Sequence, residues 1–214
     1  MDRRINTTLK GSWDKRTLTS RLQIDVGAEN PVALDISMPS LPQKNGLPNF
    51  SKFEDLSINV VYNGQLQPVF KLLDLTEQNL AGDAAIDVTI TDIAGNQPNI
   101  DGSVRIINGS WSHLIHGTVI RDLSFSATSS GQNNIAYILK GRDNTKGTLK
   151  STGELIFKPG GPEFSSETLL QGFSVVQQDL IHAKLDGNVT ARAKHQNISV
   201  QGALKIDEAF VNLN

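Results

Sequence analysis

The stretch that decides the fold is GDAAIDVTITDIAGNQPNIDGSVRIINGSW, residues 82–111. Apolar and polar residues alternate along it, with Ile86, Val88 and Ile90 in a first run and residues 104–106 in a second. Strict alternation places successive side chains on opposite faces of a β-strand, so each run predicts a strand with one apolar face. The Gly- and Asn-containing segment between the runs is typical of a turn.

The same unit returns near the C-terminus as GNVTARAKHQNISVQGALKIDEAF, residues 187–210. In both copies a glycine opens the unit and a second glycine precedes the closing apolar run. An aromatic residue ends each copy, Trp111 in the first and Phe210 in the second. The chain is therefore expected to repeat one β-unit along a long surface with a single apolar face.

Alternating runs of this kind extend over most of the chain and predict more than ten antiparallel strands. The exceptions are a Pro-, Asn- and Gly-rich loop over residues 39–49 and the segment 66–75, where apolar residues recur at three- and four-residue intervals after Pro68 and predict one short helix. The runs that predict strands are 22–26, 32–38, 58–60, 86–90, 104–106, 119–125, 135–139, 149–157, 173–175, 181–185, 189–193, 198–200 and 204–206.

The predicted fold class is all-β, an elongated antiparallel sheet with one short helix. A sheet with one apolar face must cover that face by closing into a barrel, stacking as a sandwich or folding into a trough. Several inward positions are alanine, and the chain has only two Trp and two Tyr. Small inward residues favour an interior with room for a ligand.

The composition argues against several classes of function. The formal net charge is -2 and the sequence pI is about 6.1, with Lys and Arg scattered along the chain, which argues against a nucleic-acid partner. The absence of cysteine excludes disulfides, thiolate zinc sites and cysteine nucleophiles. No apolar run is long enough for a membrane-spanning helix, and residues 1–10 contain no signal-like apolar core. We interpret the chain as a segment of a longer protein that does not itself span a membrane.

The order of these elements resembles the TamB family of AsmA-like bridge proteins. The resemblance is carried by the 66–75 segment followed by Gly82 and its strand, by residues 98–109, by Gly117 running into a strand, and by the glycine-spaced strands of 147–157 and 173–206. It covers residues 50–214, which we take as a TamB-like β-groove segment. Residues 1–49 match only as groove strands with the Pro-, Asn- and Gly-rich loop.

The resemblance implies a sheet folded lengthwise into a taco-like hydrophobic groove. It also implies a periplasmic location in a protein held by an inner-membrane anchor, which this chain lacks. The expected function is carriage of phospholipid acyl chains between the inner and outer membranes. One alternative is a chaperone role in outer-membrane protein assembly with the barrel protein TamA, and another is a structural β-solenoid without a ligand.

Residues that could perform chemistry are few. His113 and His116 are spaced to chelate a metal if they lay on a helix, but no third ligand is nearby, and we interpret them as part of a solvent-exposed loop. The sequence contains no nucleophile elbow, phosphate-binding glycine loop or paired carboxylates. We therefore expect a protein that is not an enzyme and that has no catalytic residue, no metal and no cofactor.

The candidate site is the apolar stripe itself. From pattern alone an ordinary packed core is the simpler interpretation, whereas the resemblance favours a lipid-binding groove. The residues predicted to line it are Ile86, Val88, Ile90, Val104, Ile106, Val119, Leu123, Phe125, Tyr137, Leu139, Leu155, Phe157, Val175, Leu185, Val189, Val200, Leu204 and Ile206.

Overall fold

The computed structural model describes residues 5–14, 17–39, 41–42, 48–49, 56–73, 75–93, 98–131, 133–178, 181–194 and 197–211. Most of them lie in strands. The elements are β1 Asn6–Asp14, β2 Thr17–Asp25, β3 Val32–Pro39, β4 Leu41–Pro42, β5 Pro48–Asn49, β6 Ser57–Gln65, α1 Leu66–Phe70 with a 3-10 turn Lys71–Leu73, β7 Gln78–Thr91, β8 Asn99–His113, β9 Thr118–Ser130, β10 Asn134–Arg142, β11 Thr148–Lys158, β12 Gly161–Gln177, β13 Ile181–Lys194 and β14 Asn197–Val211.

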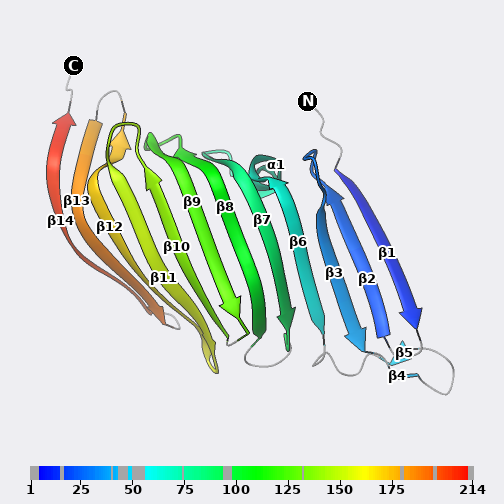
Figure 1. Ribbon diagram of the computed structural model, residues 1–214. Coiled ribbons are helices and arrows are strands. Elements are labelled where there is room, and N and C mark those ends of the chain that lie inside the picture. The colour runs from blue at the N-terminus through cyan, green and yellow to red at the C-terminus, as the bar shows by residue number, and fades with distance from the viewer. Residues whose placement is uncertain are drawn as a thin grey trace.

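Twelve strands form one antiparallel sheet in the order β1-β2-β3-β6-β7-β8-β9-β10-β11-β12-β13-β14, and β4 pairs with β5. Figure 1 shows the strands side by side in a single layer, with β1 and β14 at opposite ends. Neighbouring strands of this sheet also follow one another in the sequence, except that β3 pairs with β6 past β4 and β5. The predicted all-β fold, an elongated antiparallel sheet with one short helix, is confirmed. The further expectation, that the sheet closes as a barrel, stacks as a sandwich or folds lengthwise into a taco-like groove, was wrong: the twelve strands form one open, uncurled sheet, and its apolar side is a broad surface.

The glycines that open the predicted repeats lie inside strands. β7 runs through Gly82 and β13 runs through Gly187, at φ +139° and +135°, values that side-chain-bearing residues rarely adopt. A Cβ at Gly187 would lie 2.0 Å from the Ala203 carbonyl oxygen of β14. These glycines therefore let neighbouring backbones approach closely. The runs 181–185 and 189–193, predicted as two strands on either side of Gly187, form the single strand β13, and the runs on either side of Gly202 form β14.

In the main sheet, one strand and half of another were missed from the sequence, and the two-residue strands β4 and β5 lie within the predicted loop 39–49. β1 carries no long apolar run, and Leu9 is the inward residue at its centre. The first half of β12, Gly161–Leu170, begins with Gly and Pro and is rich in polar residues, which in isolation are typical of a loop. Its pairing with β11 from Gly161 to Gln171 extends it as a strand, because the neighbour satisfies its backbone hydrogen bonds.

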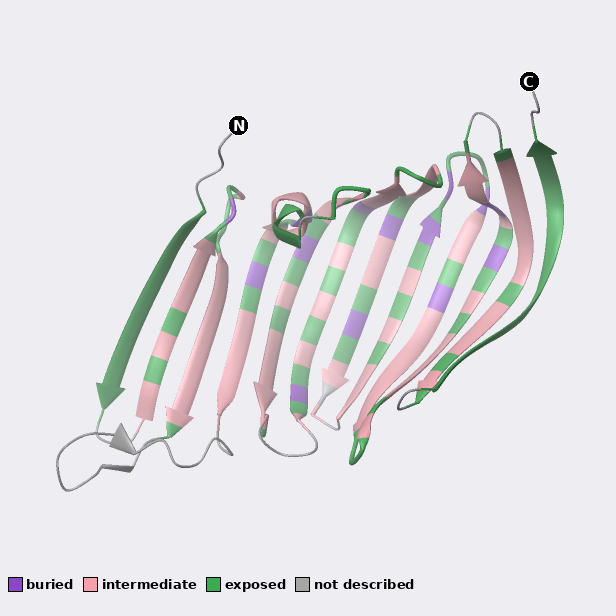
Figure 2. Cartoon of the chain, turned by 180° about the vertical axis from the view of Figure 1, so that it is seen from behind, coloured by how far each residue is buried: buried purple, intermediate pink, exposed green. Residues whose placement is uncertain are grey.

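The helix covers a small part of the apolar face between the two edge strands, beside the strand termini where β6 ends and β7 begins (Figures 1 and 2). It ends at Phe70 and continues as the 3-10 turn to Leu73, slightly short of the predicted limit at residue 75. Leu66 packs against Tyr62 and Ala84 in the main buried cluster. Tyr62 is 2% exposed and its hydroxyl donates to the Gln65 carbonyl, while burial raises the pKa of the Tyr62 phenol. This cluster anchors the helix to the sheet.

The β10–β11 turn is held to β12 by a buried carboxylate, that of Asp143. It accepts backbone N–H groups from Thr145 at 2.8 Å, Gly147 at 2.9 Å and Ser174 at 2.8 Å, as well as the Thr145 hydroxyl at 2.9 Å. Burial alone would raise the pKa of Asp143, but the hydrogen bonds from Ser174 and Thr145 lower it to about 2.

Beyond this turn, the end of β12 reaches the turn between β8 and β9. The Gln177 N–H donates to the His116 carbonyl at 3.0 Å, and the Thr118 hydroxyl donates to the Val175 carbonyl at 2.5 Å. The short strands β10 and β11 lie between these two segments in the sheet. The same edge of the sheet is thus tied together across strands that are not sequence neighbours.

Candidate functional site: the apolar face

The registers of the ladders align apolar residues of successive strands on one face. Ile36 lies opposite Ile58, Ile58 opposite Ile90, and Ile90 opposite Ile100, which makes a row across four strands. Residues that lie directly opposite each other in a ladder project from the same side of the sheet. The row is therefore a continuous apolar strip perpendicular to the strands.

A second row runs further. It begins with Leu22, Leu34 and Val60 and continues with Val88 opposite Gly102. Other ladders carry the same face across β9 to β14, so that it has members in all twelve strands of the main sheet. Residues of this face in the later strands include Phe125, Tyr137, Leu139, Leu155, Phe164, Val189, Val200 and Leu204.

The structure brings together the predicted lining residues except two. Val119 pairs with Ser112. The next residue, Ile120, lies against Gly141, and Gly141 is on the same apolar face as Leu139. Val119 therefore lies on the opposite face, and its prediction was wrong. The cause is a bulge in β9 at Asp122, which has φ +47°. The bulge reverses which side chains face the apolar side, although the apolar–polar alternation in the sequence continues through it.

Val175 is the second exception. The β12–β13 register shifts between Ser174 and Val176, which leaves Val175 as the extra residue of a bulge rather than a regular member of the stripe. The predicted residues that the ladders do place on the shared face are Ile86, Val88, Ile90, Val104, Ile106, Leu123, Phe125, Tyr137, Leu139, Leu155, Phe157, Leu185, Val189, Val200, Leu204 and Ile206.

The face also includes residues that were left out of the predicted lining. Leu9 and Trp13 of β1 lie opposite Leu22 and Leu18. Phe164 of β12 lies opposite Leu155. In β2, the apolar–polar alternation of residues 18–24 indicates which side chains face inward. β1 and the start of β12 have too few apolar residues to show which of their side chains face inward.

The apolar face is long. Twelve strands at a spacing of about 4.8 Å span about 50 Å from β1 to β14, more than the length of one extended acyl chain. Exposure is greatest at the two ends, where Leu9 is 70% exposed, Ile198 78% and Ile206 64%. Apart from α1, no described element covers this face (Figure 2).

An aromatic row crosses the middle of the face. The ring of Tyr137 stacks 6.0 Å from Phe125 and 6.2 Å from Phe164, measured between ring centroids. Gly153 of the intervening strand leaves room for the Tyr137 ring, because a Cβ there would lie 2.6 Å from the Tyr137 Cε1. The Tyr137 hydroxyl lies 3.2 Å from the hydroxyl of Ser151, so a small polar group interrupts the apolar surface here.

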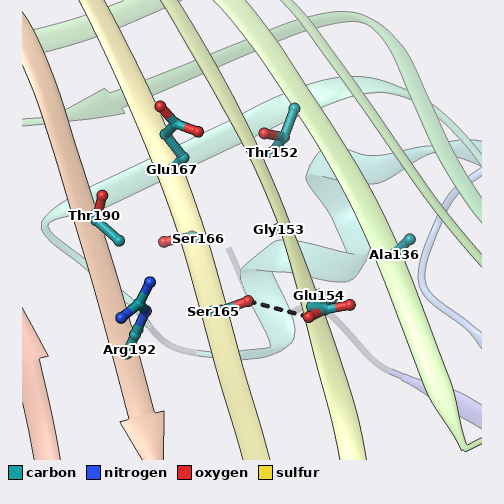
Figure 3. A pocket seen from close by; sticks show the side chains of 9 residues that line it. All are labelled: Ala136, Thr152, Gly153, Glu154, Ser165, Ser166, Glu167, Thr190 and Arg192. Carbon is teal, nitrogen blue, oxygen red and sulfur yellow. Dashed lines mark hydrogen bonds between the residues drawn. The ribbon is translucent and has the colours of Figure 1, made fainter.

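The opposite face is mainly polar and charged, although Val61, Ile138 and Leu169 are partly exposed on it. It carries a hollow of about 430 Å³ over β10 to β13, lined by side chains that include Glu154, Glu167 and Arg192 (Figure 3). Two lysines flank Glu163 on this face, Lys158 at 2.6 Å and Lys194 at 2.9 Å, and they lower its pKa to about 2. The outward face of the sheet is therefore mainly polar and solvated, whereas the other face is apolar.

The prediction that His113 and His116 share a solvent-exposed loop holds only for His116, which is exposed in the turn after β8, whereas His113 is the last residue of β8 and is half-buried. The rings of His113 and His116 stack with centroids 4.7 Å apart. In the described part of the chain, no three His, Asp or Glu side chains are placed to hold a metal ion. Within the same ranges, no helix is long and apolar enough to cross a membrane.

Comparison with protein-family models, with curated proteins and with solved structures finds no match to this chain. The likeness to the TamB family therefore rests on the residues quoted above.

Proposed function

We propose that this chain carries phospholipid acyl chains on its apolar face, as a periplasmic part of a TamB-type bridge between the inner and outer membranes. The observation that supports the proposal best is the register-aligned apolar face, which has members in all twelve strands and is covered only by α1 among the described elements. An open apolar surface of this extent is unusual for a soluble protein and marks a site of interaction.

The expected affinity of an acyl chain for the apolar face is compatible with movement of a lipid along it. Burying one methylene contributes about 0.8 kcal/mol, so a chain of roughly 14 methylenes with one side against the sheet gains about 5 kcal/mol. Neighbouring rows such as Leu34–Val60 and Ile36–Ile58 offer similar aliphatic surfaces. A lipid can therefore move between sites of similar energy while its head group stays in water. The proposal assigns no chemical step to any residue.

The experiment measures binding of a phospholipid with a pyrene-labelled acyl chain by the purified chain. Leu139 and Ile138 are neighbours on β10 that project from opposite faces. We expect Leu139→Asp to weaken binding at least tenfold, since it places a charge in the apolar strip. Ile138→Asp is the matched control and should bind as the unaltered chain does, with circular dichroism verifying that both variants fold. Equal binding by both variants would contradict the proposal.

A second candidate is a chaperone role in outer-membrane protein assembly, with TamA as the partner. It is favoured by the backbone edges of β1 and β14, each of which has a described neighbour on one side only. Unpaired edges can accept an extended polypeptide strand. This candidate predicts crosslinks to polypeptide at the edges, whereas lipid carriage predicts crosslinks to lipid across the whole apolar face.

A further inference from the structure

We propose that the hydroxyl groups of Tyr137, Ser151 and Thr168, in the middle of the apolar face, form a binding site for the ester carbonyl of a glycerolipid. The inference rests on the proposed lipid carriage and deepens it, because it names the polar group of the lipid that the chain recognises. The three residues belong to β10, β11 and β12, which lie in the interior of the sheet. We call them the hydroxyl cluster.

The ladders place the hydroxyl cluster on the apolar face. Ser151 lies opposite Leu139 of β10 and opposite Thr168 of β12. Thr168 in turn lies opposite Val189 of β13. Tyr137 precedes Leu139 by two residues on β10, so both side chains project from the same side of the sheet. The β10–β11 and β11–β12 ladders keep one register along their described length, so the three hydroxyls reach the face by regular alternation.

The hydrogen bonds inside the hydroxyl cluster leave one donor over. The Thr168 hydroxyl donates to the Ser151 oxygen at 2.9 Å. The Tyr137 and Ser151 oxygens lie 3.2 Å apart, and either of them can be the donor. Three hydroxyl protons are therefore present for two hydrogen bonds. One O–H, that of Tyr137 or that of Ser151, has no partner among the described residues.

A ligand that covers the hydroxyl cluster must supply a hydrogen-bond acceptor. Tyr137 and Thr168 are half-buried, so a ligand on the face contacts the cluster. A methylene group cannot accept a hydrogen bond, and an acyl chain lying over the cluster would leave the remaining donor buried and unpaired, at a cost in free energy. The ester carbonyl of a glycerolipid is an acceptor placed directly beside the acyl chain. It can accept the O–H while the chain stays on the apolar face.

Apolar residues flank the hydroxyl cluster in both directions along the strands. Leu149 lies opposite Leu170 on one side of it, and Leu155 lies opposite Phe164 on the other. Leu149 and Leu155 are about 20 Å apart along the extended strand β11. An acyl chain can therefore lie on apolar surface while its ester group meets the cluster, and the head group projects from the open sheet into water.

The test is displacement of a phospholipid with a pyrene-labelled acyl chain from the full chain by two unlabelled competitors. One is a short-chain phosphatidylcholine with ester-linked chains, and the other is the same lipid with ether-linked chains, which has no carbonyl. The measured quantity is the ratio of the concentrations at which the ether and the ester lipid displace half of the label. This ratio also contains the difference in hydrophobicity between the two lipids, so it is compared between variants.

The triple variant Tyr137→Phe/Ser151→Ala/Thr168→Val removes all three hydroxyls and keeps side chains of similar shape. We expect the ratio to be about fivefold higher in the unaltered chain than in the triple variant, the factor that one hydrogen bond contributes. Thr152→Val is the matched control and should keep the higher ratio, since Thr152 follows Ser151 on β11 but lies opposite Ile138 on the polar face. Equal ratios in the unaltered chain and the triple variant would overturn the inference and leave lipid carriage intact. If no lipid binds, lipid carriage and this inference both fail.

A second measurement needs no variant and covers the case in which the triple variant fails to fold. In the unaltered chain, nuclear Overhauser contacts are expected between the Thr168 methyl group and the lipid methylene next to the ester carbonyl. Contacts of this methyl group with the far end of the acyl chain alone would overturn the inference, because the ester group would then lie elsewhere on the face.

Discussion

Replacing Asp143 by alanine is expected to destabilise the fold strongly, because this carboxylate joins the β10–β11 turn to β12. The side chain is 4% exposed and accepts hydrogen bonds from three backbone N–H groups and one hydroxyl. Its pKa of about 2 in the folded chain lies roughly two units below the usual value of about 3.9, which corresponds to about 3 kcal/mol in favour of the ionised folded form. Loss of the hydrogen bonds leaves buried donors unpaired, so we expect a total cost of about 3 kcal/mol.

The pH dependence follows from the lowered pKa. Since the folded chain binds the proton less readily than the unfolded chain, the stabilisation is present above pH 4 and is lost as the pH falls from about 4 towards about 2. Urea unfolding of the unaltered chain and of Asp143→Ala should therefore differ by about 3 kcal/mol at pH 7 and by much less at pH 2.

A nearby control separates this effect from a general loss of negative charge. Glu208 pairs with Lys184 at 2.6 Å on the surface, and the Glu208 side chain is 55% exposed. Exposed ion pairs typically contribute less than about 1 kcal/mol. Glu208→Ala should therefore cost much less than Asp143→Ala. A cost for Asp143→Ala within about 0.5 kcal/mol of zero, or one that is the same at pH 7 and pH 2, would refute the reasoning.

Two other substitutions test the packing of the apolar face. Gly153→Val should lower the free energy of unfolding by about 3 kcal/mol or more in a urea titration, because its Cβ would lie 2.3 Å from the Ser165 carbonyl oxygen and 2.6 Å from the Tyr137 ring; an unchanged midpoint would contradict the close approach. Tyr62→Phe should cost about 1 kcal/mol in the same assay, since it removes the buried hydrogen bond to Gln65 without changing the ring; a stabilised variant would contradict that role.

The sequence predicted the fold class and most of the apolar face because alternation has the same period as a strand. The inward residues of 86–90 and 104–106 lie on the face where that period places them, and Ile86 lies opposite Val104 in the β7–β8 ladder. Glycine was the misleading signal. Gly82 and Gly187 were interpreted as the start of strands, but each lies within a strand where two backbones approach closely.

The errors in the predicted lining have one physical cause. A β-bulge adds a residue and changes which side chain faces inward, and its position depends on the partner strand as well as on local sequence. The bulges near Asp122 and near Val175 therefore displaced Val119 and Val175 from the stripe. Strands with few apolar residues, such as β1, form because they pair with a neighbouring strand. A single sequence does not show which segments pair, so these strands could not be predicted.

The central claim is that lipid chains bind along one face of this sheet. The most direct measurement places a photo-crosslinking residue at inward positions Val88, Tyr137 and Val189, and at their outward neighbours Asp87, Ile138 and Asn188, in the presence of phospholipid vesicles. The account predicts that crosslinks to lipid form at all three inward positions and are absent from the outward ones. Equal labelling of both faces, or no lipid crosslink at any inward position, would contradict it.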